Sequence, residues 1–263
     1  MQNEEKNSKA GAGLTQSLCK AFDILGCFTP DTPLLRITDI TRRVGMTQSN
    51  VSRLVATMVA YGYLEKDEDS GCYQLGRRII TMSSVALNHS ALRCQALPEL
   101  FALEQKYGVG ANLAVLDHGS MYYLAHVDSR NSPRMYTMVG YTNPLHCTAI
   151  GKVLLAAMTN EEIEEVLREK GMPSFTFNTI TSPEALMEQI DRCRRLGYSV
   201  EYGEHALNSA CIATGIRNRT GKVIAGLSVS GKFKGESLKD HEEEVAAIVI
   251  ESAALISNRL GFL

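Results

Sequence analysis

The 263-residue sequence has no excess of charge of either sign, since 27 lysines and arginines stand against 29 aspartates and glutamates. This balance gives no indication of a nucleic-acid or membrane partner, because surplus charge is what would indicate one. Only a local imbalance could do so. The hydrophobic content of 44% is sufficient for one large core or for two smaller ones.

The sequence also lacks paired cysteines and long apolar runs. Its seven cysteines are odd in number and contain no C-x-x-C pair, which favours reduced thiols in a cytosol over a secreted disulfide framework. Residues 1–13 are polar and have no apolar segment typical of a signal peptide. No apolar run reaches the ~18 to 20 residues of a membrane span. We therefore expect a soluble, cytoplasmic protein.

The N-terminal quarter of the chain predicts a winged helix-turn-helix. Residues 1–13 are expected to form a flexible tail, and residues 14–76 to form three helices followed by a hairpin. Thr38 and Thr47 are predicted to cap the second and third helices. The stretch YLEKDEDSGCYQLG predicts two short strands joined by an acidic turn. The apolar positions of the first helix are Leu18, Ala21, Phe22, Leu25 and Phe28.

The third predicted helix has one apolar face and one face rich in small hydrogen-bonding side chains. Amides can pair bidentately with adenine, and arginine with guanine or phosphate, so this face suits the major groove. Residues 36–53 carry four arginines against one acid, a local charge of 4 − 1 = +3. The alternative is that these polar residues only form a solvated helix start. The hairpin that follows the helix disfavours this alternative, because it completes a winged helix-turn-helix. The predicted buried stripe is Val51, Leu54, Val55, Met58 and Val59; the predicted DNA contacts are Arg36, Thr47, Gln48, Ser49, Asn50, Ser52 and Arg53.

The rest of the chain predicts a linker helix and an α+β domain. Residues 77–95 contain no helix breaker and are predicted to form one connecting helix, with residues 96–263 as a second domain. In that domain helices and strands are mixed, and the last two long strands are joined by a hairpin through residues 218–221. This pattern favours an α+β sensor-like domain over a parallel Rossmann sheet. Few cations are available in one DNA-binding module, so two copies on a palindromic operator are expected.

Several stretches, in this order, resemble the IclR family of bacterial transcriptional regulators: ITDITRRVGMTQSNVSRLVATMVAYGYLEKD, YQLGRR, PLHCTAIGKVLLA, RRLGYSVEYGEHALNSACIATGI and KVIAGLSVSG. The resemblance covers the chain from Leu14 to Gly261. It implies a winged helix-turn-helix, a linker helix that mediates homodimers, and an antiparallel-sheet effector domain similar to GAF and PAS domains. It also implies that two dimers can associate, and that a small carboxylate-containing metabolite modulates operator binding. Members repress or activate, and we expect a repressor.

The same resemblance implies where the effector binds. In the helix start at residues 148–151, free N–H groups suit a carboxylate, while Ser228 and Ser230 alternate with apolar residues on a strand. A small core residue is the alternative role for Cys211, and a solvated sheet face the alternative for the two serines. Polar Asn208 and Ser209 favour a hydroxylated acid, such as a sugar acid, over a bare keto acid. The implied effector contacts are Met135, Ala149, Ile150, Glu201, Ser209, Cys211, Ser228 and Ser230.

Two other functions compete with this interpretation. A thiol-dependent enzyme would need a pair such as His146 with Cys147 or His205 with Cys211, but neighbouring side chains point apart and no orienting carboxylate has a recognisable spacing. A redox sensor would use Cys72 in the wing, where acidic neighbours disfavour the thiolate. We expect no catalytic residue, no cofactor and no metal site, because four ligands at closed spacing are not visible.

One further position in the DNA-binding module is unusual. In sequences that the chain resembles, an alanine is common at the place of Thr41, because the two helices of the motif cross closely there. Threonine adds a hydroxyl group and a branched β-carbon. We expect this hydroxyl to donate to the carbonyl of Ile37, which would keep the helix intact at small cost.

Overall fold

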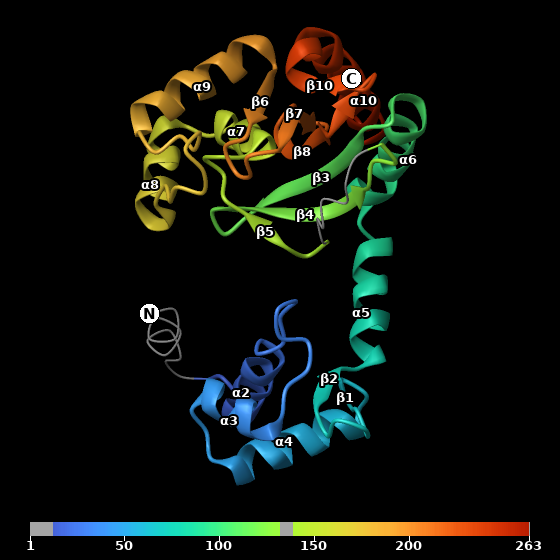
Figure 1. Ribbon diagram of the computed structural model, residues 1–263, viewed down its shortest axis with the longest axis vertical. Helices are drawn as coiled ribbons and strands as arrows, with labels where there is room; N and C mark the ends of the chain where they lie inside the picture. The colour runs from blue at the N-terminus through green and yellow to red at the C-terminus, as the bar shows by residue number, and fades with distance from the viewer. Residues whose placement is uncertain (1–12, 132–138, 263) are drawn as a thin grey trace. The chain divides into compact units, whose positions relative to one another are not determined.

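The computed structural model describes residues 13–131 and 139–262, and the chain divides into two compact units, Met1–Ala86 and Leu87–Leu263 (Figure 1). The expected flexible tail lies outside the described residues, except for Gly13. Among the described residues, no helix is both long enough and apolar enough to cross a bilayer.

Within the N-terminal unit, the described residues 13–76 form three helices and a hairpin around one small core, as predicted. Ile24, Ile40, Val51, Val55 and Leu64 are each at most 1% exposed and form its centre. Burial of such side chains against one another is what holds a module of this size together. Its elements are α2 (Gln16–Leu25), α3 (Ile37–Val44), α4 (Gln48–Ala60), β1 (Leu64–Lys66) and β2 (Tyr73–Leu75).

Parts of the predicted apolar stripes are not buried. Val59 is 36% exposed, so the buried stripe of α4 ends at Met58, and Leu54 is half-buried. In α2 the side chains of Leu18 and Phe22 are 53% and 60% exposed, whereas Ile24 is fully buried. Helical spacing identified both helices correctly but assigned too wide a face to the core.

The caps of the helices also differ from the prediction. Helix α3 begins at Ile37, one residue before the predicted cap Thr38, and the Asp39 carboxylate accepts a hydrogen bond from the backbone N–H of Arg36 at 3.3 Å. An acid in the first turn stabilises that helix end without a hydroxyl cap. Thr47 does occupy the N-cap position of α4, but its side chain makes no capping hydrogen bond.

The expected hydrogen bond from Thr41 to the Ile37 carbonyl is wrong. The hydroxyl oxygen of Thr41 is buried and has no hydrogen-bond partner among the described residues. Nearby Gly45 has a φ of 65°, the left-handed conformation that ends α3 and that glycine adopts without strain. The Thr41 hydroxyl is thus buried without donating to the carbonyl of its own helix.

The predicted single helix over residues 77–95 is two helices. Helix α5 (Arg77–Asn88) ends before Ser90, and α6 (Ala91–Tyr107) begins after it. The hydroxyl of Ser90 accepts a hydrogen bond from the N–H of Arg93 at 3.3 Å, which is an N-cap. Ser90 was the sequence signal for this break between the two helices, because serine favours a helix start over a helix interior.

The C-terminal unit is built on a six-stranded antiparallel sheet with the strand order β5-β4-β3-β8-β7-β6. The predicted pairs flanking residues 118–119 and 218–221 are hairpins within this sheet. The strands of the sheet are β3 (Gly110–Asp117), β4 (Ser120–Val127), β5 (Thr142–Asn143), β6 (Tyr198–Tyr202), β7 (Ala210–Arg217) and β8 (Val223–Ser230).

Helices cover both faces of this sheet (Figure 1). Helices α6 and α10 (Glu242–Arg259) pack on one face around Leu100, Leu227 and Val249. On the other face lies α7 (Ala149–Ala156); α9 (Pro183–Leu196) packs against both α7 and β6, and α8 (Asn160–Lys170) belongs to the same core cluster. The predicted last helix is preceded by a short hairpin and a 3₁₀ turn: β9 (Lys232–Phe233), β10 (Glu236–Ser237) and η1 (Leu238–His241). The predicted α+β class is confirmed.

Candidate functional site

The outer face of α4 carries the side chains predicted to contact DNA. Val51, Val55 and Met58 turn inward and are buried, so the helix presents its other side to solvent. Ser49 and Asn50 lie in its first turn, where backbone N–H groups are unpaired. All seven predicted DNA contacts are exposed: Arg36, Thr47, Gln48, Ser49, Asn50, Ser52 and Arg53.

The four arginines counted in this region are not equally available. The Arg43 guanidinium donates to the carbonyl of Cys27 at 2.8 Å and to the hydroxyl of Thr32 at 2.9 Å, so it holds a loop of its own unit. Arg42 lies 3.4 Å from the Asp39 carboxylate. The local charge of +3 therefore overstates how many cations are available to a phosphate backbone.

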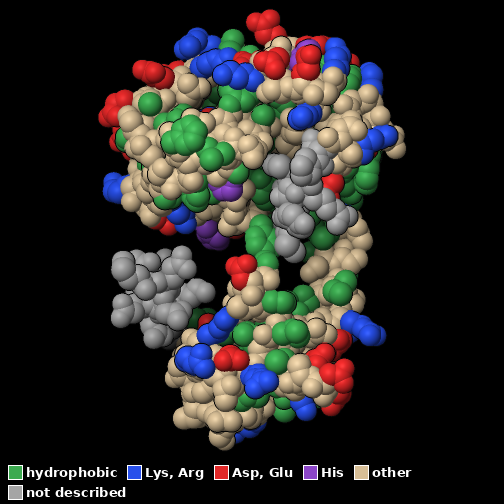
Figure 2. Space-filling view, in the orientation of Figure 1, with side chains coloured by type: hydrophobic (Ala, Val, Ile, Leu, Met, Phe, Trp, Pro, Cys, Tyr) green, Lys and Arg blue, Asp and Glu red, His purple; other side chains and the backbone are tan. Residues whose placement is uncertain are grey.

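The turn between β1 and β2 is acidic. The Asp67 carboxylate accepts hydrogen bonds from the N–H and the hydroxyl of Ser70, both at 2.7 Å, and these bonds lower the pKa of Asp67. Glu68 and Asp69 are exposed beside it. Figure 2 shows acidic side chains gathered on the part of the N-terminal unit where this hairpin lies. This turn would repel a phosphate backbone rather than attract it.

In the C-terminal unit, α7 begins beside several predicted effector contacts. The Thr148 hydroxyl accepts a hydrogen bond from the N–H of Gly151 at 3.2 Å and donates to the carbonyl of Pro144 at 2.7 Å. This cap leaves the N–H groups of Ala149 and Ile150 outside the helix's own hydrogen-bond pattern. Both of these residues are 2% exposed. The helix start can therefore offer two N–H donors to an anion, fewer than the sequence suggested.

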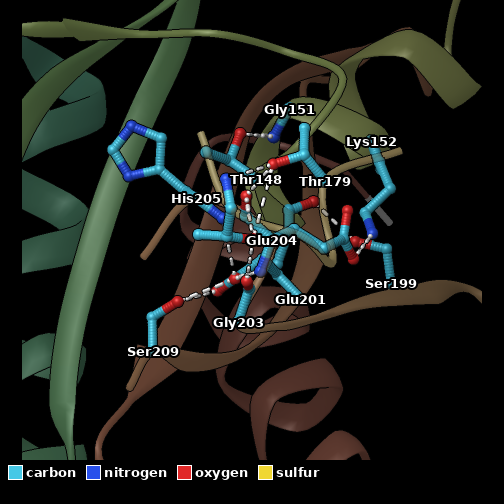
Figure 3. A network of polar contacts seen from close by, with 12 residues as sticks. Thr148, Gly151, Lys152, Thr179, Ser199, Glu201, Gly203, Glu204, His205 and Ser209 are labelled. Carbon is cyan, nitrogen blue, oxygen red and sulfur yellow. Dashed lines mark hydrogen bonds and ion pairs between the residues drawn. The ribbon is translucent and has the colours of Figure 1, made fainter. Parts of the chain in front are cut away.

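Glu201 organises the loop that follows β6 (Figure 3). Its carboxylate accepts hydrogen bonds from the N–H of Glu204 at 2.6 Å, the N–H of His205 at 3.2 Å and the hydroxyl of Ser209 at 2.7 Å. The side chain is buried, with only 2% of the residue exposed. Two predicted effector contacts, Glu201 and Ser209, are thus hydrogen-bonded to each other.

A buried ion pair, absent from the sequence predictions, lies next to this loop. The Lys152 ammonium and the Glu204 carboxylate are 2.6 Å apart, and the Lys152 side chain is 1% exposed. The other carboxylate oxygen of Glu204 is buried and has no partner among the described residues. Burial raises the pKa of Glu204, and Lys152 opposes that shift. A lysine inside the apolar stretch TAIGKVLLAAM was the available signal, because lysine is rarely buried unpaired.

The remaining predicted contacts lie on adjacent strands of the sheet. Glu201 is opposite Cys211 on β7, and Cys211 is opposite Ser230 on β8. Ser228 and Ser230 are buried, so they do not form a solvated face. Burial raises the pKa of the Cys211 thiol, and so does the neighbouring Glu201 carboxylate. Met135, the last predicted contact, lies outside the described residues.

His146 and Cys147, one of the pairs considered for a thiol-dependent enzyme, are in an unfavourable setting for catalysis. His146 Nε2 lies 3.1 Å from the carbonyl of Pro173 and its pKa is lowered by burial. Burial raises the pKa of Cys147 to about 12, so this thiol stays protonated at neutral pH. In the part of the chain that the structure describes, no cluster of three or more histidine, cysteine or acidic side chains could hold a metal ion.

A cavity of about 550 Å³ lies at the opposite end of α7. Its lining includes Val153, Gly215, Val223 and Ile250 but none of the predicted effector contacts. The cavity and the predicted effector site are therefore separate places in this unit.

Comparison with known proteins identifies the family. Residues 84–258 match the family model of the bacterial transcriptional regulator IclR C-terminal domain, and residues 17–68 match the IclR helix-turn-helix domain. The HTH-type transcriptional regulator KdgR of Dickeya chrysanthemi is 35% identical over 249 residues, which cover 94% of this chain and 80% of the relative. KdgR of Escherichia coli K12 is 34% identical over 249 residues, covering 94% and 93%.

Solved structures agree with these sequence matches. An IclR homolog from Microbacterium hydrocarbonoxydans, crystallised with 4-hydroxybenzoate, has a TM-score of 0.82 and 31% identity over 93% of this chain and 99% of its own. Thermotoga maritima IclR has a TM-score of 0.77 and 27% identity, covering 94% and 99%. The chain belongs to the IclR family of bacterial transcriptional regulators, with a DNA-binding helix-turn-helix and an effector domain.

Proposed function

We propose that this regulator represses transcription by binding a specific operator through the exposed face of α4. The observation that carries the proposal is the composition of that face: Gln48, Ser49, Asn50, Ser52 and Arg53 are all exposed and carry short or hydrogen-bonding side chains. Such a face can approach base edges in the major groove, where amides read adenine and arginine reads guanine. Few of its neighbours are free cations, so base contacts rather than phosphate contacts supply most of its specificity.

We further propose that the protein binds as a homodimer to a palindromic operator, and that two dimers can associate. The limited positive charge of one module supports the first part, because one copy would bind DNA weakly at physiological salt. A two-fold symmetric dimer doubles the contacts when its half-sites are spaced by about one helical turn. The acidic turn between β1 and β2 strengthens the need for a second copy.

We propose that a small carboxylate-containing metabolite binds beside the start of α7 and modulates operator binding. The two N–H donors of Ala149 and Ile150 suit a carboxylate. Buried hydroxyl groups of Ser228 and Ser230 supply polar contacts on the adjoining sheet. A relative crystallised with 4-hydroxybenzoate, itself a hydroxylated carboxylate, is consistent with this class of ligand. The two serines and Ser209 favour a hydroxylated acid over a bare keto acid.

The test is to map the operator by genomic footprinting and then to measure the affinity of the full-length protein for it with and without carboxylic acids. A palindromic site whose genes are expressed more strongly when the regulator is deleted would support the proposal. A set of bound sites without two-fold symmetry, or lower expression after deletion, would contradict it. Comparing reduced protein with peroxide-treated protein separates metabolite sensing from redox sensing.

A further inference from the structure

A β-bulge in β4 changes which side chains face α7. Leu113 of β3 pairs with Ala125, whereas the next residue, Ala114, pairs with Tyr123, so Leu124 is an extra residue in β4. An inserted residue reverses the alternation of side chains along a strand. Tyr123 packs with the α7 side of the sheet, and Ala125 packs with the α10 side. Beyond the bulge, even-numbered residues therefore face α7.

His126 is the residue that this bulge turns toward the α7 side. Its Nδ1 lies 2.7 Å from Asn112 Oδ1, and its Nε2 lies 2.9 Å from Asp128 Oδ1. Asn112 Nδ2 in turn donates to the hydroxyl of Ser228 at 3.3 Å. The side chains on three neighbouring strands thus form one continuous chain of hydrogen bonds that ends at a predicted effector contact.

The hydrogen-bonded side chains Ser228, Asn112 and His126, called the polar row below, begin where α7 no longer covers the sheet. A Cβ atom on Gly226 would lie 2.5 Å from Ile150, so α7 rests on the sheet at that point. Ser228 follows two residues later on the same face, and both it and Asn112 are at most 5% exposed. On the opposite face of the same strand the buried residue is Leu227, as an ordinary core would have. Buried polar side chains in place of apolar ones are the informative feature, because they are costly unless hydrogen-bonded.

We propose that Asn112, held in place by His126, is an effector contact that selects hydroxyl groups, so that the effector is a polyhydroxylated carboxylic acid. This inference rests on the proposed effector site and extends it by two strands beyond Ser228. The carboxylate would lie at the start of α7, and the hydroxyl groups beside Ser228 and Asn112, whose amide His126 orients.

The chemistry of the row explains the preference for hydroxyl groups. Both ring nitrogens of His126 are occupied by Asn112 and Asp128, but Asn112 Nδ2 has a second N–H and the Ser228 hydroxyl has a proton, and neither is used within the row. A ligand hydroxyl group both donates and accepts, so it can bind to these two side chains. An alkyl chain can do neither, and it would leave polar groups of the row desolvated without a new partner. A site built to hydrogen-bond a ligand hydroxyl therefore discriminates strongly against the analogue that lacks it.

The experiment compares two acids of equal chain length, D-gluconate and hexanoate, and the shorter pair D-xylonate and pentanoate, by isothermal titration calorimetry on the full-length protein. The wild type is expected to bind at least one sugar acid about tenfold more tightly than its alkanoate. Asn112→Leu and His126→Leu should each reduce that ratio by about five- to tenfold through weaker binding of the sugar acid. His126→Gln, which keeps hydrogen-bonding groups, should restore part of the ratio.

The control is His118→Gln, since the His118 side chain is 94% exposed on the β3–β4 turn and lies outside the row. Each variant is required to melt within a few degrees of the wild type, and His126→Ala and Asn112→Ala replace any leucine variant that does not. If carboxylates bind but hydroxyl groups or these two residues make no difference, the inference is wrong while the proposed effector site stands. If no acid of either series binds, both are wrong.

Discussion

Lys152 and Glu204 form an ion pair in the interior of the effector domain, with 2.6 Å between the ammonium nitrogen and one carboxylate oxygen. Helix α7 carries the lysine, and the loop organised by Glu201 carries the glutamate. The pair therefore joins the two elements between which the proposed effector site lies. Its contribution depends on both partners being present, because either charge alone would be buried without compensation.

Removal of one partner should be more harmful than removal of both. Lys152→Met leaves the Glu204 carboxylate buried and unpaired, and we expect it to lower the free energy of unfolding by about 3–5 kcal/mol. The double variant Lys152→Met/Glu204→Leu should recover most of this loss. Urea denaturation of the full-length proteins, followed by circular dichroism, measures both. Equal losses in the single and double variants would show that the pair is not coupled.

Glu204 should also make stability depend on pH in a direction opposite to that of most carboxylates. Burial raises its pKa in the folded protein above the usual value of 4.5. The unfolded state therefore loses this proton first, and the stability that Glu204 contributes falls as the pH rises from its unfolded pKa through its folded pKa. The difference in unfolding free energy between wild type and Glu204→Gln should decrease over that range. A difference that stays flat between pH 4 and pH 7 would contradict the assignment.

Thr41 offers a site where a substitution should stabilise the protein. Its buried hydroxyl oxygen has no partner among the described residues, so replacing the hydroxyl by a methyl group removes a desolvation cost. We expect Thr41→Val to raise the free energy of unfolding of the N-terminal unit by about 1 kcal/mol. Thr57→Val is the matched control, because the Thr57 hydroxyl donates to the carbonyl of Arg53 at 2.9 Å. A gain at Thr57 as large as that at Thr41 would exclude this explanation.

The acidic turn of the hairpin should weaken DNA binding. Glu68→Gln/Asp69→Asn removes two exposed negative charges, and we expect higher operator affinity at low salt, with a smaller gain at high salt. Asp67 is kept because its carboxylate shapes the turn. Fluorescence anisotropy at several salt concentrations measures the effect, and Glu164→Gln on α8 is the control. Unchanged affinity at low salt would place the turn away from the duplex.

Local patterns predicted most of the fold. Ser182 and Pro183 lie at the start of α9, Gly197 at its end and Gly45 at the end of α3, and such end signals are visible in a sequence because capping and turn chemistry are local. The break at Ser90 was missed because uninterrupted helical periodicity outweighed one capping residue. The exposure of Val59 was missed because the width of a buried face depends on the partner helix.

The candidate sites were predicted less evenly. The exposed face of α4 followed from helical geometry, as did the common face of Ser228 and Ser230 from strand alternation. His126 could not be found in this way, because the bulge at Leu124 reverses the alternation that would have been applied to it. The pairing of Lys152 with Glu204 joins residues 52 positions apart, and no local pattern encodes such a contact.

Arg53→Ala tests most directly whether α4 reads DNA. The measurement is operator affinity as a function of salt, with Arg219→Ala, an exposed arginine of the effector domain, as the control. If Arg53 contacts a phosphate, the slope of log K against log salt should flatten by about 1 unit; if it reads a guanine, binding should weaken by about 1–3 kcal/mol at that base pair. Affinity and slope equal to those of the wild type would contradict the account.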